Sequence, residues 1–272
     1  MDLEFYRKER LLMSGVISVI TPVHRAGLAY LSAAYDSLAS QHLPSGWSWE
    51  WLVQEDGGDV DSAAVLPSDS RIHIAASRKG GPHVTRTVSL GRSSGDLIKN
   101  LDSDDVLSVG VLARDIEVLT NHPDVGWTTS AVIDLLPDGS TTTFPGDPVG
   151  GRIQRTAVYR HWSQHRRAQV HPATICARRD LVLALGGWMA LPASGDTGLL
   201  LGLDAVADGW FHTEVGLQYR KHEGQITADP RHTKGPEWEA RMAVIGEHAR
   251  ALHSLIAGEA PNVLRSNSHP IS

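Results

Sequence analysis

Short β-branched segments alternate with stretches of helical spacing in the first half of the chain, and this alternation restricts the fold more than any other feature. Residues 16–20 (VISVI) lie between Gly15 and Pro22 and are typical of a buried strand. Apolar residues at helical spacing follow at Leu28, Leu31, Tyr35 and Leu38. The chain therefore begins with a predicted strand, a loop and a helix.

The alternation continues for about a hundred residues. Further strands are predicted at residues 49–54, 71–75 and 97–101, and helices at 83–93 and around Leu112, Ile116 and Leu119. Strands and helices that alternate in this way favour an α/β fold, with a mostly parallel sheet and helices on both faces. In such folds the ligand lies at the carboxyl ends of the strands.

The pattern changes beyond Pro123. Residues 126–135 and 140–144 flank a Pro-Asp-Gly turn and predict a hairpin. Helices are predicted at 153–162 and 180–185, with an extended segment at 174–177. A C-terminal amphipathic helix is predicted from Pro236 by apolar residues at helical spacing, namely Trp238, Met242, Ile245, Ala249, Leu252 and Ile256. The tail that follows is predicted to be loosely ordered.

Composition excludes several classes of protein. Of the 272 residues 41% are hydrophobic, which is enough for a substantial core. The net charge of -6 disfavours a nucleic-acid binder, because such proteins need basic charge to displace counterions. No segment approaches the ~20 apolar residues of a membrane span, and the first residues lack the apolar run of a signal peptide. We therefore expect a cytoplasmic protein without a transmembrane segment. Cys176 is the single cysteine, so an intramolecular disulfide is excluded.

Three familiar motifs fail on inspection. Residues 91–95 fit the G-x-S-x-G pattern, but a nucleophile elbow needs a strand before the serine and a helix after it, and here the predicted order is reversed. His161 and His165 are four apart without the glutamate of a zinc protease. The chain also lacks the glycine patterns of dinucleotide-binding and P-loop proteins.

An acidic cluster, Asp102, Asp104 and Asp105, lies where the fourth predicted strand ends. One interpretation is local: Asp105 caps a helix that begins near Val109. The other is a divalent cation that carries a diphosphate and makes the clustered negative charge favourable.

Four segments that follow predicted strands favour the second interpretation: TPVHR (21–25), EDGGD (55–59), RKGGPHVTRT (78–87) and LDSDD (101–105). In this order they resemble the nucleotide-binding half of family 2 glycosyltransferases of the GT-A fold. The resemblance continues through residues 178–188, 194–197 and 219–224. It implies a Rossmann-like GT-A domain with a C-terminal helical extension. We predict an N-terminal extension (1–14), a nucleotide-sugar-binding half (15–122), an acceptor-binding half (123–235), and a C-terminal helix and tail (236–272).

The resemblance also assigns donor-binding residues. The loop after the first strand would wrap the nucleotide with Thr21, Pro22 and Val23, with Arg25 close by, and Asp56 would accept a hydrogen bond from the imide N–H of uracil. Arg78, Gly80 and Arg86 belong to the third segment, where Arg86 is the favoured clamp for the diphosphate. Asp102, Ser103 and Asp104 match the DxD element. Asp102 would lie near the ribose or a metal-bound water, and Asp104 would bind Mn²⁺ or Mg²⁺, with His222 as a third ligand. Asp105 would cap the next helix.

Asp196 matches the position of the general base. The resemblance implies that it removes the proton of an acceptor hydroxyl in a single displacement with inversion. Members of the family often have Glu-Asp here, whereas Gly195 precedes Asp196 in this chain. That departure puts the acceptor-facing surroundings in question. Residues 154–167 are basic and aromatic; they could stack a sugar on Trp162, or form an ordinary amphipathic helix.

The sequence thus predicts a metal-dependent, inverting glycosyltransferase of the hexosyl- or N-acetylhexosaminyl-transferase type. It would move one sugar from a nucleotide-diphosphate donor, expected to be UDP-linked, to a hydroxyl of a small-molecule, glycan or carrier-bound acceptor. The absence of a QxxRW segment argues against processive synthesis. Two alternatives stay open: a nucleotidyltransferase-like nucleotide-sugar enzyme, and a non-catalytic nucleotide- or glycan-binding module. The sequence leaves the oligomeric state open.

Overall fold

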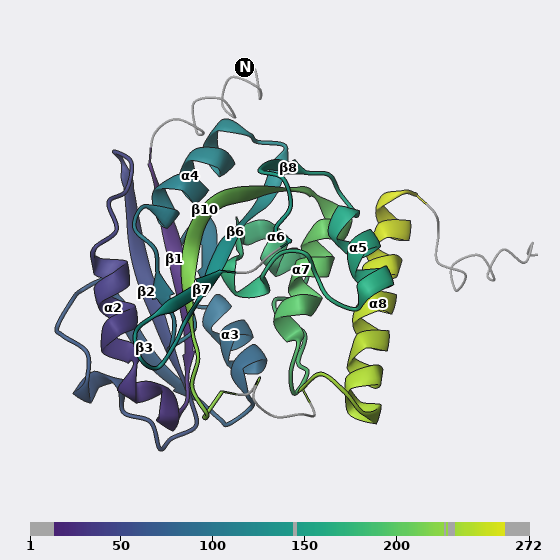
Figure 1. The fold of residues 1–272 in the computed structure, drawn as a ribbon. Coiled ribbons are helices and arrows are strands. Elements are labelled where there is room, and N and C mark those ends of the chain that lie inside the picture. Colours follow the sequence, from purple (N-terminus) through teal and green to yellow (C-terminus); the bar gives the residue numbers. More distant parts are fainter. Residues whose placement is uncertain (1–13, 144–145, 226, 228–231, 259–272) are drawn as a thin grey trace, which may run out of the picture.

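The structure is a computed structural model that describes residues 14–143, 146–225, 227 and 232–258. Within these residues ten strands form one sheet, in the order β3-β2-β1-β4-β9-β6-β10-β5, with β7 beside β6 and β8 beside β10 (Figure 1). The strands are β1 (Gly15–Val23), β2 (Trp47–Asp56), β3 (Ile72–Ser77), β4 (Leu97–Asn100), β5 (Val106–Leu107), β6 (Val125–Leu135), β7 (Thr141–Thr143), β8 (Gly151–Ile153), β9 (Cys176–Arg178) and β10 (Asp208–Arg220).

The sheet is parallel in its two main parts. Strands β3, β2, β1 and β4 run parallel to one another, as do β6 and β10, and antiparallel β9 joins the two parts. The helical elements are η1 (Arg25–Ala29), α2 (Leu31–Ala39), η2 (Ser62–Ala64), α3 (Pro82–Leu90), α4 (Val111–Asn121), α5 (Ala157–His165), η3 (Pro172–Thr174), α6 (Arg179–Ala184), α7 (Gly195–Val206) and α8 (Pro236–Ile256). The predicted α/β architecture of GT-A type is confirmed.

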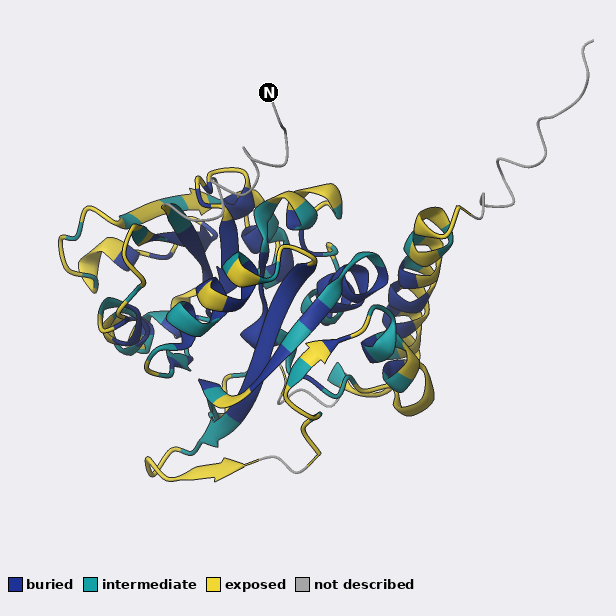
Figure 2. Ribbon diagram, turned by 90° about the horizontal axis from the view of Figure 1, so that it is seen from above, coloured by how far each residue is buried: buried dark blue, intermediate teal, exposed yellow. Residues whose placement is uncertain are grey.

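Helices cover both faces of the sheet, because the strand side chains alternate between two cores. In β1, Ile17 and Val19 join the core that α2 and α4 close, whereas Ile20 joins the core that α3, α5, α6, α7 and α8 close. The central strands are buried on both faces, while the outer side of α8 is exposed (Figure 2). Burial on both faces is expected for strands whose sequences are continuous apolar runs.

Two strands extend further than predicted. Strand β1 continues to Val23, so Thr21, Pro22 and Val23 belong to a strand and not to a loop. Strand β2 likewise includes Asp56. Both extensions pair with a neighbour, for Pro22 is opposite Gln54 and Asp56 is opposite Ser77. Pro22 lies beyond the part of β1 that pairs with β4, where its missing N–H is tolerated.

The predicted cap at Asp105 is wrong. Helix α4 begins at Val111, and its N-cap is Gly110 in the left-handed conformation (φ 75°). Strand β5 lies between Asp105 and the helix and pairs with β10. Asp105 is fully buried, and its Oδ1 accepts a hydrogen bond from the Arg220 N–H (2.9 Å). It therefore fastens the end of β10 to the loop after β4.

Helix α7 and strand β10 have no counterpart in the sequence prediction. Helix α7 has glycines at 195, 198 and 202 and buried leucines on several sides, so it shows no polar face. Strand β10 has register shifts in its pairing with β6, which break the period-two pattern.

Helix α8 has the predicted span and packs its buried face, including Met242, Ile245 and Ala249, beside α7 and α5 (Figure 1). The predicted N-terminal extension falls almost wholly outside the described residues, and the tail from 259 does so entirely. Among the described helices, none has the length and apolar character needed to cross a membrane.

Candidate active site

A cavity of about 600 Å³ opens at the carboxyl ends of β1 and β4. Pro22, the first turns of α3, and the loop that follows β4 form one wall. The first turn of α7 lies beside them, and the end of α5 with the start of α8 forms the opposite wall. This is the edge of an α/β sheet where ligands bind.

The cavity brings together six of the predicted site residues, namely Pro22, Arg86, Asp102, Ser103, Asp104 and Asp196. The others lie outside its lining. Thr21 and Val23 are buried in β1, and Thr21 Oγ1 accepts a hydrogen bond from Trp51 Nε1 (2.8 Å). Arg25 and Arg78 are exposed at the surface. The side chains of Thr21 and Val23 therefore belong to the core.

Asp56 holds the loop that precedes α3. Its Oδ1 accepts hydrogen bonds from the Gly80 N–H (2.6 Å) and from Thr85 Oγ1 (3.1 Å), and its Oδ2 accepts from the Gly81 N–H (3.1 Å). Both carboxylate oxygens are thus engaged within the protein, and Gly80 takes part as one of the donors. The predicted contact of Asp56 with a uracil base stays a prediction.

Arg86 and Asp102 form an ion pair at the cavity wall. The Arg86 side chain is only 5% exposed, because α3 packs it behind the loop that follows β4. Its Nη1 also lies 3.2 Å from His83 Nδ1. Ser103 is buried next to η1, where a side chain at Gly27 would collide with Ser103 Oγ.

Asp104 and His222 meet from distant parts of the chain. Asp104 Oδ2 lies 2.8 Å from His222 Nε2, although 118 positions separate the two residues. Arg220 holds this arrangement, because its Nε donates to the Asp104 carbonyl oxygen (2.8 Å) while its N–H donates to Asp105. Burial, followed by the negative charges of Asp102 and Asp104, raises the pKa of the Asp105 carboxyl well above its usual value.

This acidic corner fits a divalent cation in part. Asp104 and His222 offer one oxygen and one nitrogen, and Mg²⁺ or Mn²⁺ completes its shell with waters and substrate phosphates. Asp102 does not complete a third protein ligand here, because Arg86 pairs with it. In the described part of the chain no cluster of three or more His, Cys, Asp or Glu side chains is arranged to hold a metal.

Asp196 lies in the first turn of α7, and buried neighbours fix the two residues before it. Ser194 has a left-handed backbone (φ 65°), which is strained for a serine. The Gly195 N–H donates to His83 Nε2 (3.1 Å), and Arg241 Nη1 of α8 donates to Ser194 Oγ (2.6 Å). The backbone that leads into Asp196 is therefore held from α3 on one side and from α8 on the other.

The geometry explains why a glycine stands at position 195. A Cβ there would lie 2.4 Å from the Met189 carbonyl oxygen and 2.6 Å from His83 Cγ. His83 thus occupies the space that a glutamate side chain would need to enter. Its burial lowers the pKa of His83 to about 4, so the ring is neutral at pH 7 and can accept the Gly195 N–H.

The electrostatic surroundings keep Asp196 ionised. Burial by itself raises the pKa of its carboxyl. In acid, where His83 is protonated, its positive charge and that of Arg86, together with the hydrogen bond from the Thr197 N–H, outweigh burial and hold the pKa below its usual value. The carboxylate is therefore free to accept a proton at neutral pH.

His83 and Arg241 are site residues that sequence reasoning missed. His83 is part of the third matched segment, three positions before Arg86 on the same helix. Arg241 lies at helical spacing between Trp238 and Ile245, so a charge stands within the apolar stripe of α8. A cation in such a stripe was the available signal.

No family model matches the chain. It is 26% identical over 166 residues to the O-antigen biosynthesis protein RfbC of Myxococcus xanthus, a match over 58% of this chain and 13% of that protein. It is 32% identical over 105 residues to an N-acetylglucosaminyltransferase of Rhizobium sp. (strain N33), over 36% of this chain and 23% of that protein. The chain thus spans less than a quarter of either relative.

Solved structures of S. aureus TarS share the fold. One matches with a TM-score of 0.63 and 14% identity over 89% of this chain and 43% of that chain. TarS 1-349 in complex with UDP-GlcNAc matches with a TM-score of 0.64 and 15% identity, over 92% of this chain and 74% of that chain. The chain therefore has the fold of the TarS structures, and parts of it are similar in sequence to an O-antigen biosynthesis protein and to an N-acetylglucosaminyltransferase. These findings agree with the resemblance to family 2 glycosyltransferases that the ordered motifs predicted.

Proposed function

We propose that the chain transfers one sugar from a UDP-linked donor, of the N-acetylhexosamine or hexose type, to an acceptor hydroxyl with inversion at the anomeric carbon. One observation carries this proposal: Asp104, beside His222, and the ionised Asp196 face the same cavity. A diphosphate-binding corner and a base at one cavity are the two parts that a single displacement needs. The similarity to TarS, which binds UDP-GlcNAc and UDP in its crystal structures, supports the UDP-linked donor.

In the proposed reaction Asp196 accepts the proton of the acceptor hydroxyl while the hydroxyl oxygen attacks the anomeric carbon. The bond from that carbon to the diphosphate oxygen breaks, and UDP leaves with the electron pair. Arg86 and the backbone of the loop after β4 would orient the diphosphate. A divalent cation bound by Asp104 and His222, with Asp102 beside it, would neutralise the negative charge of the leaving diphosphate.

The proposed donor-binding residues differ in whether they line the cavity. Pro22 and Ser103 line the same cavity as Asp104, which supports the proposal that they contact the nucleotide. Asp56 would read the base only if the loop at Gly80 released one of its carboxylate oxygens. Replacing Asp56 with Asn therefore tests two roles at once, because binding of UDP and stability would both fall.

Transfer from a panel of UDP-sugars with Mn²⁺ tests the proposal, with Asp196→Asn and Asp104→Asn as variants. We expect Asp196→Asn to lower turnover at least about 100-fold with little change in the affinity for UDP. Asp104→Asn should weaken the binding of UDP in the presence of Mn²⁺. Asp36→Asn is the matched control, because Asp36 is exposed on α2 and does not line the cavity.

Each alternative gives a distinct result. Full turnover by Asp196→Asn would refute the assignment of the base. Release of pyrophosphate from UTP, without use of UDP-sugars, would favour a nucleotidyltransferase. Binding of UDP-sugars without hydrolysis or transfer in the presence of any acceptor would favour a binding module.

A further inference from the structure

The wall of the cavity opposite the acidic corner is basic. It consists of the end of α5 and the segment that leads to η3, where Arg166 and Arg167 line the cavity. Between Asp147 and Asp180 the sequence contains seven arginines and no acidic residue, within a chain whose net charge is -6. Two of these seven arginines, Arg166 and Arg167, line the cavity.

Arg166 and Arg167 keep their charges available to a ligand. Both side chains are exposed, and the described residues place no carboxylate within ion-pair distance of either one. Arg86, the other arginine of the cavity, is instead neutralised by Asp102. The acidic residues of the lining are distributed differently: Asp102 and Asp104 have partners at the donor end, Asp196 is in α7, and Asp147 lies before β8.

Arg166 occupies a position that a smaller residue would fill with less strain. It is the C-cap of α5 with a left-handed backbone (φ 53°), a conformation that favours glycine or asparagine. Its guanidinium lies 5.3 Å from the ring centroid of the buried Trp162, which holds the charge at the rim of the cavity. A large cation at a position that suits glycine is a feature that helix termination alone does not explain.

We propose that this wall binds an anionic group of the acceptor, a phosphate or a carboxylate carried by a sugar or polyol. The inference rests on the proposed function, because it assigns the two ends of one cavity to donor and acceptor. A guanidinium group matches the planar or tetrahedral oxygens of such an anion, and Arg166 and Arg167 are consecutive in the chain and line the same cavity. Trp238 and Met242 of α8 line the same region and provide apolar surface for the sugar or polyol itself.

Binding to the UDP-saturated protein tests this assignment without need of the natural acceptor. The probes are methyl glucoside, methyl glucoside 6-phosphate and methyl glucuronide, titrated by calorimetry or ligand-observed NMR in the presence of Mn²⁺ and excess UDP. We expect at least one anionic probe to bind about tenfold or more tightly than the neutral one. The two anionic probes distinguish a phosphate from a carboxylate.

The variants Arg166→Gln and Arg167→Gln, alone and together, should reduce this preference to within about twofold while the affinity for UDP stays unchanged. The control is Arg160→Gln, which removes the same charge from α5 at a residue outside the cavity and should keep the preference. Equal binding of all three probes to the unaltered protein, or a preference that survives the double variant, would overturn the proposal. If the unaltered protein did not bind UDP, that result would instead count against the proposed function.

Discussion

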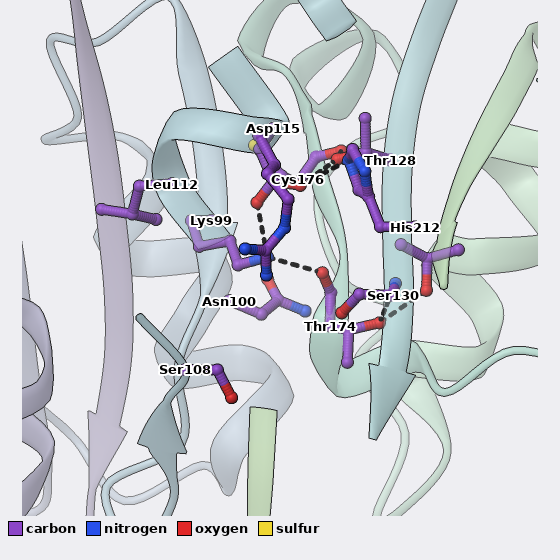
Figure 3. Close-up of polar contacts among 12 residues, drawn as sticks. Lys99, Asn100, Ser108, Leu112, Asp115, Thr128, Ser130, Thr174, Cys176 and His212 are labelled. Carbon is purple, nitrogen blue, oxygen red and sulfur yellow. Dashed lines mark hydrogen bonds and ion pairs between the residues drawn. The ribbon is translucent and has the colours of Figure 1, made fainter. Parts of the chain in front are cut away.

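Replacing Lys99 with Met breaks an ion pair that is closed off from water. Lys99 Nζ in β4 lies 2.7 Å from Asp115 Oδ2 in α4 and donates to the Thr174 carbonyl oxygen at 2.8 Å (Figure 3). The two side chains are 1% and 0% exposed. Thr128 Oγ1 of β6 donates to Asp115 Oδ1 (2.6 Å). The pair thus joins β4, α4, β6 and η3 at one point.

The cost of losing the lysine follows from the charge that stays behind. A buried carboxylate without its partner costs about 3 to 5 kcal/mol, and the unpaired Thr174 carbonyl adds about 1 kcal/mol or more. Methionine preserves most of the apolar stem, so little of the loss comes from packing. A loss of this size is a large fraction of the ~5 to 15 kcal/mol by which domains are stable.

The dependence on pH has a defined sign. Burial raises the pKa of Asp115, but Lys99 and His212 outweigh it and hold the pKa below its usual value. A depressed pKa gives stability that is present above the pKa of the unfolded state and is lost as the pH falls through the folded value. Without Lys99 the largest charge that opposes burial is gone and the pKa of Asp115 rises, so the variant gains less stability than the unaltered protein as the pH rises. The difference in the free energy of unfolding between the unaltered protein and Lys99→Met should therefore become smaller as the pH falls.

Urea unfolding at pH 7 and pH 5 measures both effects, with the exposed Lys79→Met as the control. Adding Asp115→Asn to Lys99→Met should recover much of the loss, because the uncompensated charge is gone while a polar partner for Thr128 remains. A loss below about 1 kcal/mol at pH 7, or a double variant no more stable than Lys99→Met, would refute this reasoning.

Three further predictions concern two residues that position Asp196 and the buried carboxyl of Asp204. Gly195→Ala should lower kcat/KM by about 100-fold with UDP affinity unchanged, because the new Cβ would meet the Met189 carbonyl oxygen at 2.4 Å and displace the loop; unaltered kinetics would contradict this. Arg241→Met should lower the free energy of unfolding in urea by about 1 to 3 kcal/mol and also lower kcat, since Ser194 loses its hydrogen-bond donor. If neither the free energy of unfolding nor kcat changed, the contact would be dispensable. Burial raises the pKa of Asp204 to about 6, so stability should fall as the pH rises from about 4 to 6, and Asp204→Asn should flatten that decline.

The sequence predicted those parts of the fold whose periodicity is local. Strands β1 to β4 and helix α8 follow from β-branched runs and an apolar stripe, and the structure confirms them. The meeting of Asp104 with His222 rested on the family resemblance, because no local pattern joins residues 118 positions apart.

The missed elements lack a period of their own. Helix α7 is packed by neighbours on several sides, and three glycines allow their close approach, so it shows no polar face. The bulges of β10 interrupt its alternation. Asp105 was misassigned because acidic residues are common at helix starts, whereas here a buried backbone N–H of Arg220 needed an acceptor.

The contact of Arg241 with Ser194 bears on where this domain can be cut and joined to other sequences. The matched motifs end before residues 236–256, yet this helix provides part of one cavity wall and a hydrogen bond to Ser194, two positions before Asp196. A chimera that joined the first 235 residues to a foreign ending would keep the acidic corner at Asp104 and lose the contact that holds Ser194 beside Asp196. For exchange of acceptor preference, the transferable module therefore includes the final helix along with the second half of the sheet.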